Sequence, residues 1–485
     1  MSLRNSILRT FFAPRLRAID RFRCHPAETQ ERMLRRLLRR AAQTGFGQRY
    51  DLQHVRSVEQ FQTKVDTFDY DSFKPYIERM KAGERNVAAP GRVRLFARSS
   101  GTTSDRSKYI PVTRESVLWN HTLGMRDVAT LFAANHPDTQ VFDGKTLTLG
   151  GSCCMENGYL VGDLSALLIR EMNFWSGWFR APRTETAVIP DFYEKADAIC
   201  RECTGQHITS FAGVPSWNLA LMRRVLEYTG KRHLLEVWPD LCLFAHGGVE
   251  FTPYRSSFEE LIPSERMNYM ETYNASEGFF ALADDPSRSD MLLMLDYGTF
   301  YEFRDGDRIV PLEGVACGKP YAMLITSNNG LWRYEIGDRV EFTSTNPYRI
   351  RFAGRTRQYI NVFGEELIVD NADRALVEAC RATGARVSEY SVAPCYMSLQ
   401  HRGAHEWFVE FEQEPASRER FAEELDRALR AVNSDYDAKR ETTLERQHLT
   451  VLPSGTFLRW MRDNRKNKVP RLVNDRRVAD QLKAE

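Results

Sequence analysis

The sequence predicts an α/β protein with a large N-terminal domain and a smaller α/β C-terminal domain. From about residue 93 to 350, short β-branched apolar runs alternate with longer helical stretches. Near residue 354 a glycine-flanked strand, turn and strand interrupt this pattern, and a shorter series of helices and strands follows. We therefore predict one domain over residues 1–358 and another over 359–485, with the smaller domain acting as a mobile lid.

The composition is that of a soluble globular protein and excludes several classes of function. The 485 residues are 42% hydrophobic and 27% charged, and a formal net charge of +2 argues against a dedicated nucleic-acid binder. No apolar run approaches the roughly 18 to 20 residues that a membrane span requires. We therefore expect a cytoplasmic enzyme or binding protein, with a monomer favoured over an oligomer.

Cysteine and histidine usage indicates neither a disulfide framework nor a structural metal. The nine cysteines are an odd number, and the adjacent Cys153 and Cys154 suit buried thiols in a reducing compartment. The ten histidines are scattered and form no HExxH motif. A structural metal is therefore not expected.

The N-terminal region predicts an amphipathic helix packed on the body of the protein. Residues 1–23 are rich in arginine and poor in acids, as transit peptides are. The arginine-rich pattern continues to about residue 50, where Met33, Leu34, Leu37, Leu38 and Ala41 fall at helical spacing on one side. A helix with a solvated basic face is therefore favoured over targeting or membrane contact.

Strands and helices alternate along the large domain. We expect strands over residues 93–97, 145–151, 207–214, 241–248 and 322–327, and helices over 114–136 and 216–230. Several of these strands end in glycine-rich turns. Ligands of open α/β sheets bind outside the carboxyl ends of the strands, so these turns are the expected place of a site.

The smaller domain shows the same alternation on a shorter scale. We expect helices over residues 371–383 and 417–432, strands over 387–393, 406–412 and 447–452, and then a basic tail. About 120 residues are enough for a compact domain of this kind.

A hydroxyl-rich segment, "RSSGTTSDRSK" at residues 98–108, separates two apolar stretches. Such a segment is either a solvated turn or a phosphate cradle of backbone N–H groups, hydroxyls and one lysine. It is not a Walker A loop, because the second glycine and the hydroxyl after the lysine are missing. Any phosphate role must therefore be of another type.

Two further segments place an acid beside a strand. In "METYNASEGFF", residues 270–280, Tyr273 could stack on a flat ring and Glu277 could hold Mg²⁺ with phosphates and water, or simply be solvated at a strand end. In "LWRYEIGDRVEF", residues 331–342, alternation predicts a strand that Gly337 stops. Asp338 could then accept two vicinal hydroxyls of a ribose, or belong to an ordinary turn.

The segment "RKNKVPRL", residues 465–472, carries a late lysine. Pro470 restricts itself and Val469, which predicts a rigid, non-helical stretch. Lys468 could deliver a positive charge to a developing oxyanion or phosphate, or it could belong to the solvated basic tail.

Taken together, these segments resemble the signatures of the acyl-adenylate-forming superfamily, which contains acyl-CoA synthetases, luciferases and adenylation domains. Within it the chain is most similar to the GH-three family of auxin-responsive acyl acid amido synthetases. The similar segments are "AAQTGFGQRY", "SSGTTSDRSKYIPVT", "FAGVPSW", "YNASEGFF", "RYEIGD" and "NKVPRL". The resemblance covers nearly the whole chain.

The resemblance implies roles for individual residues. The phosphate-binding loop would contain Ser99, Ser100, Gly101, Thr102 and Thr103, with Lys108 at its end. Tyr273, Asn274, Ala275 and Ser276 would line the adenine and acyl-phosphate region, and Glu277 would face Mg²⁺ or phosphate. Asp338 would bind the ribose, Arg355 would be the arginine of the hinge turn, and Lys468 would be the catalytic lysine of the small domain. Phe211, Val214 and Trp217 would form the wall of the acyl pocket.

The resemblance also implies a reaction that uses ATP and Mg²⁺. A carboxylic acid would be activated as acyl-AMP and then transferred to an amine, most simply that of an amino acid, to form an amide. An acyl-CoA ligase would share the first half of this reaction and stays as an alternative. A non-catalytic nucleotide-binding protein of the same fold is a second alternative, although Glu277, Asp338 and Lys468 are all present.

Overall fold

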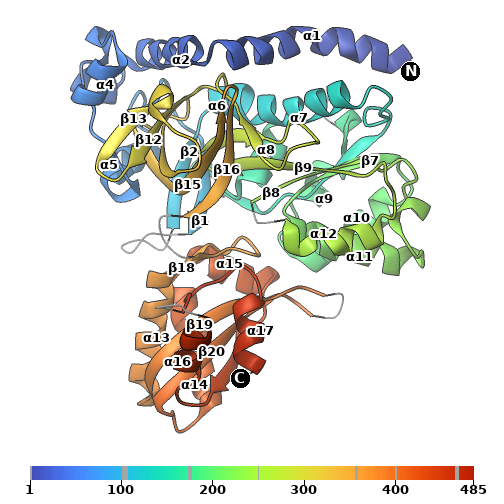
Figure 1. Cartoon of the computed structure of the whole chain (residues 1–485), viewed down its shortest axis with the longest axis vertical. Helices are drawn as coiled ribbons and strands as arrows, with labels where there is room; N and C mark the ends of the chain where they lie inside the picture. Colours follow the sequence, from blue (N-terminus) through green and yellow to red (C-terminus); the bar gives the residue numbers. More distant parts are fainter. Residues whose placement is uncertain are drawn as a thin grey trace.

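The chain folds into a large and a small α/β part, which lie at opposite ends of the long axis of the molecule (Figure 1). The computed structural model describes residues 3–100, 107–172, 177–248, 251–355, 359–398, 401–464 and 469–484. The large part contains a twelve-stranded and a four-stranded sheet, and the small part contains a three-stranded sheet. The predicted fold class is confirmed.

The twelve-stranded sheet runs in the order β13-β12-β14-β15-β16-β11-β10-β9-β8-β7-β3-β6. Its strands are β3 Lys145–Thr148, β6 Arg180–Ala181, β7 Ile208–Gly213, β8 Leu243–Gly247, β9 Asn268–Ala275, β10 Gly278–Leu282, β11 Met291–Leu293, β12 Thr299–Asp305, β13 Arg308–Pro311, β14 Pro320–Ser327, β15 Tyr334–Thr345 and β16 Tyr348–Arg355. From β9 to β6 the neighbours are parallel, whereas the other pairs are antiparallel. The parallel half places the carboxyl ends of five strands along one edge.

The four-stranded sheet has the order β2-β1-β5-β4 and contains residues 98–100 and 107–108 of the hydroxyl-rich segment. Its strands are β1 Leu95–Ser100, β2 Ser107–Val112, β4 Cys153–Glu156 and β5 Tyr159–Gly162. β1 and β2 pair in an antiparallel hairpin, so Ser99 and Ser100 belong to a strand and not to the predicted loop. The strand that begins in the apolar run continues to Ser100, because the backbone groups of Ser99 and Ser100 pair with those of Lys108 and Ser107.

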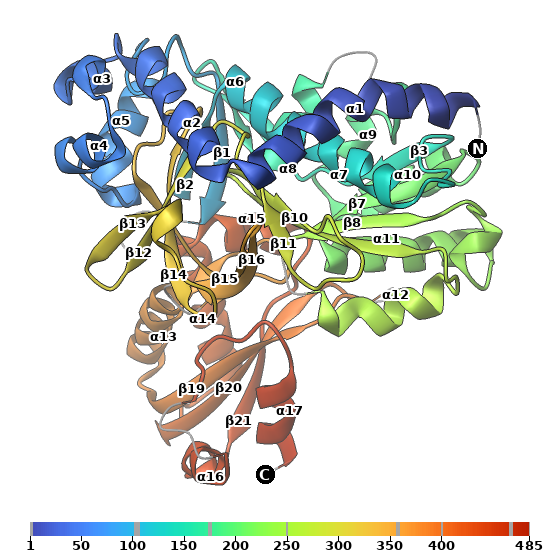
Figure 2. The same ribbon diagram turned by 45° about the horizontal axis from the view of Figure 1, so that its top comes forward.

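Helices cover both faces of the parallel half of the large sheet, α7 on one side and α10, α11 and α12 on the other (Figures 1 and 2). The helices of the large part are α1 Leu3–Cys24, α2 Pro26–Ala41, α3 Gly45–Arg49, α4 Val58–Lys64, α5 Tyr70–Lys81, α6 Arg114–Ser116, α7 Thr122–Asn135, α8 Leu164–Glu171, α9 Thr184–Ala187, α10 Phe192–Cys203, α11 Pro215–Thr229 and α12 Arg255–Leu261. Short 3-10 helices occupy Leu52–His54, Leu234–Glu236, Thr252–Tyr254 and Leu312–Gly314. Within the described residues, no helix has the length and apolar character needed to cross a membrane.

The predicted amphipathic helix is α2, which runs together with α1 along the top of the large part in Figure 1. Its five predicted apolar positions, Met33, Leu34, Leu37, Leu38 and Ala41, are all buried. The prediction that this helix packs on the body is therefore confirmed.

The helix predicted over residues 114–136 is interrupted. It begins as α6, continues as a π-helical turn over Val117–His121, and becomes α7. A π-helical turn inserts one residue into the helix and turns the side chains that follow it. Asn120 and His121, two polar residues of this turn, are buried.

The small part is a three-stranded sheet covered by helices, and a short hairpin leads into it. The hairpin strands are β17 Tyr359–Ile360 and β18 Leu367–Ile368, and the sheet contains β19 Arg386–Cys395, β20 Ala404–Gln413 and β21 His448–Leu452. The helices are α13 Val369–Thr383, α14 Arg418–Val432, α15 Ser434–Thr442, α16 Thr456–Asp463 and α17 Arg477–Ala484. The basic tail predicted after residue 452 was wrong in part, because α16 and α17 bury Phe457, Trp460 and Leu482 beneath their charged faces.

The small part packs directly on the large part. One core cluster joins residues of both, among them Trp238 in the large part and Trp407 in the small part. Ser216 Oγ donates a hydrogen bond to Val362 O over 2.7 Å, and the rings of Tyr254 and Tyr396 lie 5.5 Å apart. The described orientation of the two parts is therefore stabilised by buried contacts.

Two buried cysteines, Cys200 and Cys203, lie three residues apart on α10. This spacing occurs in metal and redox sites. Burial raises the pKa of the Cys200 thiol to about 11 and that of Cys203 to about 12. Both are therefore protonated near neutral pH and have the character of core residues.

Candidate active site

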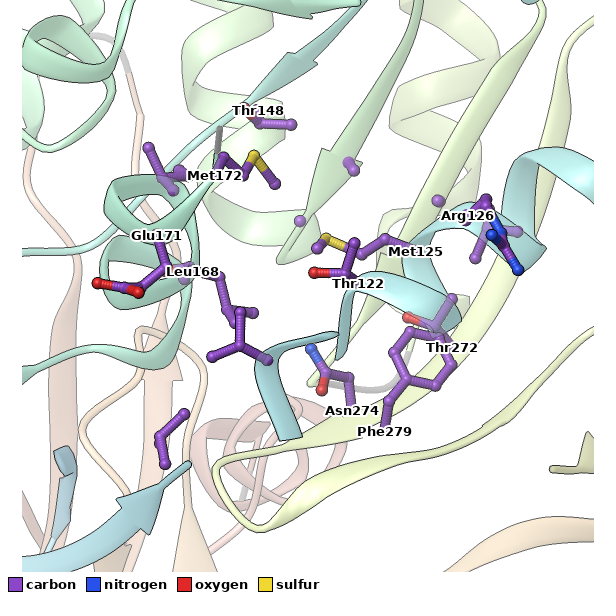
Figure 3. A pocket seen from close by; sticks show the side chains of 18 of the residues that line it. Thr122, Met125, Arg126, Thr148, Leu168, Glu171, Met172, Thr272, Asn274 and Phe279 are labelled. Atoms are coloured by element: carbon purple, nitrogen blue, oxygen red, sulfur yellow. The ribbon is translucent and has the colours of Figure 1, made fainter. Parts of the chain in front are cut away.

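A cavity of about 1730 Å³ opens at the carboxyl ends of β3, β7, β8 and β9 (Figure 3). Side chains from α7, α8 and β9 surround it. Figure 3 labels ten of the lining residues: Thr122, Met125, Arg126, Thr148, Leu168, Glu171, Met172, Thr272, Asn274 and Phe279. Phe363, Gly364 and Lys439 of the small part complete the wall. The cavity therefore lies at the carboxyl ends of strands, where a site was predicted, and both parts of the chain contribute to it.

The three residues predicted for the acyl pocket line this cavity, but they differ in character. Phe211 on β7 is fully buried and its ring stacks on that of Phe244, with 4.4 Å between centroids. Val214 precedes α11, and Trp217 is in its first turn. The Trp217 ring also contacts two lysines, so it is more than an apolar wall. Acyl binding by these residues stays a prediction.

Tyr273 of β9 and Asp338 of β15 lie together in the interior. The Tyr273 hydroxyl donates a hydrogen bond to Asp338 Oδ2 over 2.6 Å. Both residues are buried, and the rings of Phe280 and Phe352 pack on that of Tyr273 with centroids 5.1 and 6.0 Å away. The structure thus brings the predicted adenine-stacking residue and the predicted ribose-binding acid into one cluster.

Asp338 lies within a strand, so the predicted strand stop at Gly337 was wrong. β15 continues to Thr345, and its pairing with β16 shifts register after Asp338. Gly337 has a φ of +88°, a conformation that favours glycine and that bends the strand without ending it. Asp338 is paired across the strands with Arg355, whose side chain lies outside the described residues.

Asn274 connects the Tyr273 cluster with the cavity. Its side chain lines the cavity, and its Oδ1 atom accepts a hydrogen bond from His121 Nδ1 over 3.2 Å. His121 is fully buried, and burial lowers its pKa to about 4. The imidazole is therefore neutral near pH 7 and holds Asn274 by donating its Nδ1 proton. Ala275 follows Asn274 at the end of β9.

Ser276 and Glu277 form the two-residue turn between β9 and β10. The Glu277 backbone carbonyl accepts a hydrogen bond from Asn329 Nδ2 over 3.0 Å, and its side chain is half-buried. In the described part of the chain, no group of three His, Cys, Asp or Glu side chains is arranged to hold a metal ion. Mg²⁺ at Glu277 would therefore take its other oxygens from phosphates and water, which is common for this ion.

The remaining predicted residues lie near or beyond gaps in the described chain. Lys108 on β2 has its ammonium group 6.0 Å from the centroid of the Tyr70 ring. Gly101, Thr102, Thr103 and Lys468 lie outside the described residues. Val469, which follows Lys468, packs in a core cluster formed by the small part alone.

Sequence reasoning missed two residues of the site, one behind the cavity wall and one in it. His121 is an isolated histidine in a helix, and only its contact with Asn274 gives it significance. Lys439 lies in α15, a charged helix of ordinary appearance, and reaches the cavity through the packing of the two parts. Neither residue belongs to a local motif.

Two solved enzymes share the fold of this chain. The chain is similar to a solved 2-hydroxyisobutyryl-CoA ligase in complex with 2-HIB-AMP and CoA, with a TM-score of 0.60, 14% identity and coverage of 95% of this chain and 93% of the other. It is also similar to the AtGH3.15 acyl acid amido synthetase in complex with 2,4-DB, with a TM-score of 0.59, 17% identity and coverage of 94% and 93%. At these identities the likeness establishes the fold.

Family models identify the protein family. The GH3 family N-terminal, central and C-terminal domains match residues 15–267, 292–355 and 370–477. The chain therefore belongs to the GH3 family, as its motifs predicted. It is 23% identical to the probable indole-3-acetic acid-amido synthetase GH3.1 of Arabidopsis thaliana over 95% of this chain and 92% of that protein. It is 22% identical to the indole-3-acetic acid-amido synthetase GH3.8 of Oryza sativa subsp. indica over 79% and 75%.

Proposed function

We propose that this protein is an acyl acid amido synthetase. In the first step, a carboxylate oxygen attacks the α-phosphorus of ATP, and acyl-AMP forms as pyrophosphate leaves. In the second step, the amine of an amino acid attacks the acyl carbon, the amine loses a proton, and AMP leaves with its phosphate oxygen. The observation that carries this proposal is the Tyr273–Asp338 cluster beside an apolar cavity closed by the small part.

The cluster and the cavity suit the two halves of an acyl-adenylate. An aromatic ring and a carboxylate held together can bind the base and the ribose hydroxyls of a nucleotide. The cavity beyond Asn274, with Met125, Leu168 and Val214 in its wall, can take the organic part of the acid. Indole-3-acetic acid, which the names of the curated relatives carry, is therefore the first acid to test.

The remaining roles follow the family motifs residue by residue. Ser99 to Thr103 and Lys108 would hold the phosphates of ATP, Asp338 would hold the ribose, and Arg355 would belong to the hinge turn. Glu277 would bind Mg²⁺, which supplies positive charge where two anions, the carboxylate and ATP, must meet. Lys468 would add charge in the transition state of the first step. The domain boundary near residue 358 stays a prediction.

Transfer to CoA is the second candidate for the acceptor step. The similar fold of the 2-hydroxyisobutyryl-CoA ligase supports it, whereas the amido synthetase relatives support an amine. Both candidates share the same adenylation step, so that step does not separate them.

One experiment separates these candidates. The protein is incubated with ATP, Mg²⁺ and a panel of carboxylic acids that includes indole-3-acetate, and hydroxylamine traps acyl-AMP as hydroxamate. The best acid is then offered with each of the twenty amino acids or with CoA. We expect acid-dependent hydroxamate and an amide with at least one amino acid. A thioester without any amide would favour the ligase, and no hydroxamate with any acid would refute adenylation.

A further inference from the structure

Lys439 of the small part lies in the wall of the cavity, among groups from the large part. It is on α15 and only 7% exposed. Its ammonium nitrogen lies 3.5 Å from Asp163 Oδ1 and 4.9 Å from the centroid of the Trp217 ring. Asp163 and Trp217 line the same cavity, so these three side chains form one polar corner in a wall that is otherwise largely apolar.

A second lysine makes this corner positive overall. Lys195 is fully buried, donates a hydrogen bond to Gly150 O, and lies 5.7 Å from the Trp217 ring centroid. Burial and the charge of Lys439 lower the pKa of Lys195 to about 8. Burial works to raise the pKa of Asp163, but the charges of Lys439 and Lys195 and the hydrogen bond from Ser152 N together keep that pKa below its ordinary value. Two lysine side chains therefore lie near one carboxylate at this corner of the cavity.

The partners of Lys439 leave hydrogen-bonding capacity for a ligand. An ammonium group has three donors, and 3.5 Å is too long for a strong hydrogen bond. Asp163 Oδ2 already accepts a hydrogen bond from Ser152 N over 2.7 Å. Across the described residues, Asp163 is the one acidic group within ion-pair distance of Lys439. An anion in the cavity would therefore accept hydrogen bonds from this buried ammonium group and balance its charge.

The turn between β17 and β18 lies against the side chain of Lys439. Gly364 has a φ of +87°, and a Cβ atom there would lie 3.2 Å from Lys439 Cε. Glycine thus allows the turn to pass close to the stem of the lysine. Gly364 and Lys439 belong to the same part and line the cavity only because that part packs as described.

We propose that Lys439 binds the α-carboxylate of the acceptor amino acid and thereby selects amino acids over simple amines. This inference rests on the proposed function. The acid substrate loses its carboxylate charge when it becomes acyl-AMP, whereas the acceptor keeps its carboxylate through amide formation. A fixed positive charge at the cavity therefore suits the acceptor during the second step.

The test compares three acceptors in the wild-type protein and in Lys439→Met. These are the best amino acid from the panel, its α-carboxamide, and hydroxylamine, which has no carboxylate. We expect Lys439→Met to raise KM for the amino acid by about 10- to 100-fold, the range for loss of a hydrogen bond to a charged group. The preference for the amino acid over its carboxamide should fall by a similar factor. Acid-dependent pyrophosphate exchange and hydroxamate formation should change less than threefold, and Lys439→Arg should retain most of the preference.

Arg402→Met provides the matched control. Arg402 also belongs to the small part, lies 3.6 Å from Asp191 and 5.8 Å from the Tyr193 ring of the large part, and does not line the cavity. Its loss should leave the acceptor preference unchanged. An equal loss of exchange, hydroxamate and amide in Lys439→Met would overturn the proposal, as would an unchanged KM for the amino acid. A wild-type protein that forms hydroxamate but uses CoA alone would instead refute the proposed acceptor step.

Discussion

Tyr273 donates a hydrogen bond to Asp338 Oδ2 over 2.6 Å and so joins two motifs that are 65 residues apart in the chain. β9 and β15 are not neighbours in the sheet, because β16, β11 and β10 lie between them. The hydroxyl orients the carboxylate that we propose for ribose binding. The same hydrogen bond holds in place the Tyr273 ring, which we propose to stack on adenine.

The first prediction concerns this hydrogen bond. Tyr273→Phe keeps the ring and removes the donor to Asp338, so KM for ATP should rise about 10-fold or more in acid-dependent pyrophosphate exchange. Tyr301→Phe is the control, because Tyr301 is also buried but donates to Met294 O over 3.1 Å. Tyr301→Phe should lower stability without changing KM for ATP. An unchanged KM for ATP in Tyr273→Phe would mean that this hydrogen bond has no role in nucleotide binding.

The second prediction concerns Glu277 and Mg²⁺. Glu277→Gln removes the negative charge and keeps the shape, so the Mg²⁺ concentration for half-maximal exchange should rise about 10-fold or more. Titration of the exchange rate with MgCl₂ at saturating ATP measures this change. Glu313→Gln, an exposed residue in the turn after β13, is the control. A Glu277→Gln titration that overlays the wild-type curve would count against metal binding by this acid.

The third prediction concerns the buried histidine beside Asn274. The folded-state pKa of His121 is about 4, well below its ordinary value of 6.5. Between these values the unfolded chain binds a proton that the folded chain excludes, so stability falls as pH falls from 6.5 towards 4. Between pH 7.5 and pH 5, His121 should therefore lower the free energy of unfolding by about 2 kcal/mol.

Urea unfolding of the wild-type protein and His121→Gln at both pH values measures this cost. Glutamine does not titrate and can still donate a hydrogen bond to Asn274 Oδ1. The wild-type protein should therefore lose about 2 kcal/mol more than the variant between pH 7.5 and pH 5. Equal losses would mean that His121 accepts a proton in the folded protein.

The fourth prediction concerns the late lysine. Lys468→Ala should lower acid-dependent pyrophosphate exchange by about 100- to 1,000-fold, the usual cost of losing one charge-stabilising group in a transition state. Binding of ATP, measured by calorimetry, should change little, because the charge acts mainly in the transition state. Pyrophosphate exchange at the wild-type rate in Lys468→Ala would show that Lys468 has no role in the first step.

Much of the fold was predictable because its signals are local. The apolar face of α2, the strands β7 and β8, and the helices α11 and α13 each follow from a period within a short window. The family could be identified for a similar reason, since its motifs are short and ordered along the chain. The twelve-strand order and the end of each strand depend on pairing between distant segments, which no window contains.

The candidate site was predictable where a motif carried it and missed where packing created it. Tyr273, Asn274, Glu277 and Asp338 stand in recognisable segments, and the structure brings Tyr273 and Asp338 into contact. Lys439 reaches the cavity only through the packing of the small part on the large part. The strand stop at Gly337 was wrong because glycine can bend a strand within a sheet as well as end it.

The most direct test of the proposed activity is the stoichiometry of its products. The protein is incubated with ATP, Mg²⁺, the best acid and the best amino acid, and nucleotides and organic products are quantified by liquid chromatography and mass spectrometry. We expect equal amounts of AMP, pyrophosphate and amide, because the carboxylate attacks the α-phosphorus. Formation of ADP and phosphate in step with the amide would contradict it, since that outcome requires an acyl phosphate and not an acyl-adenylate.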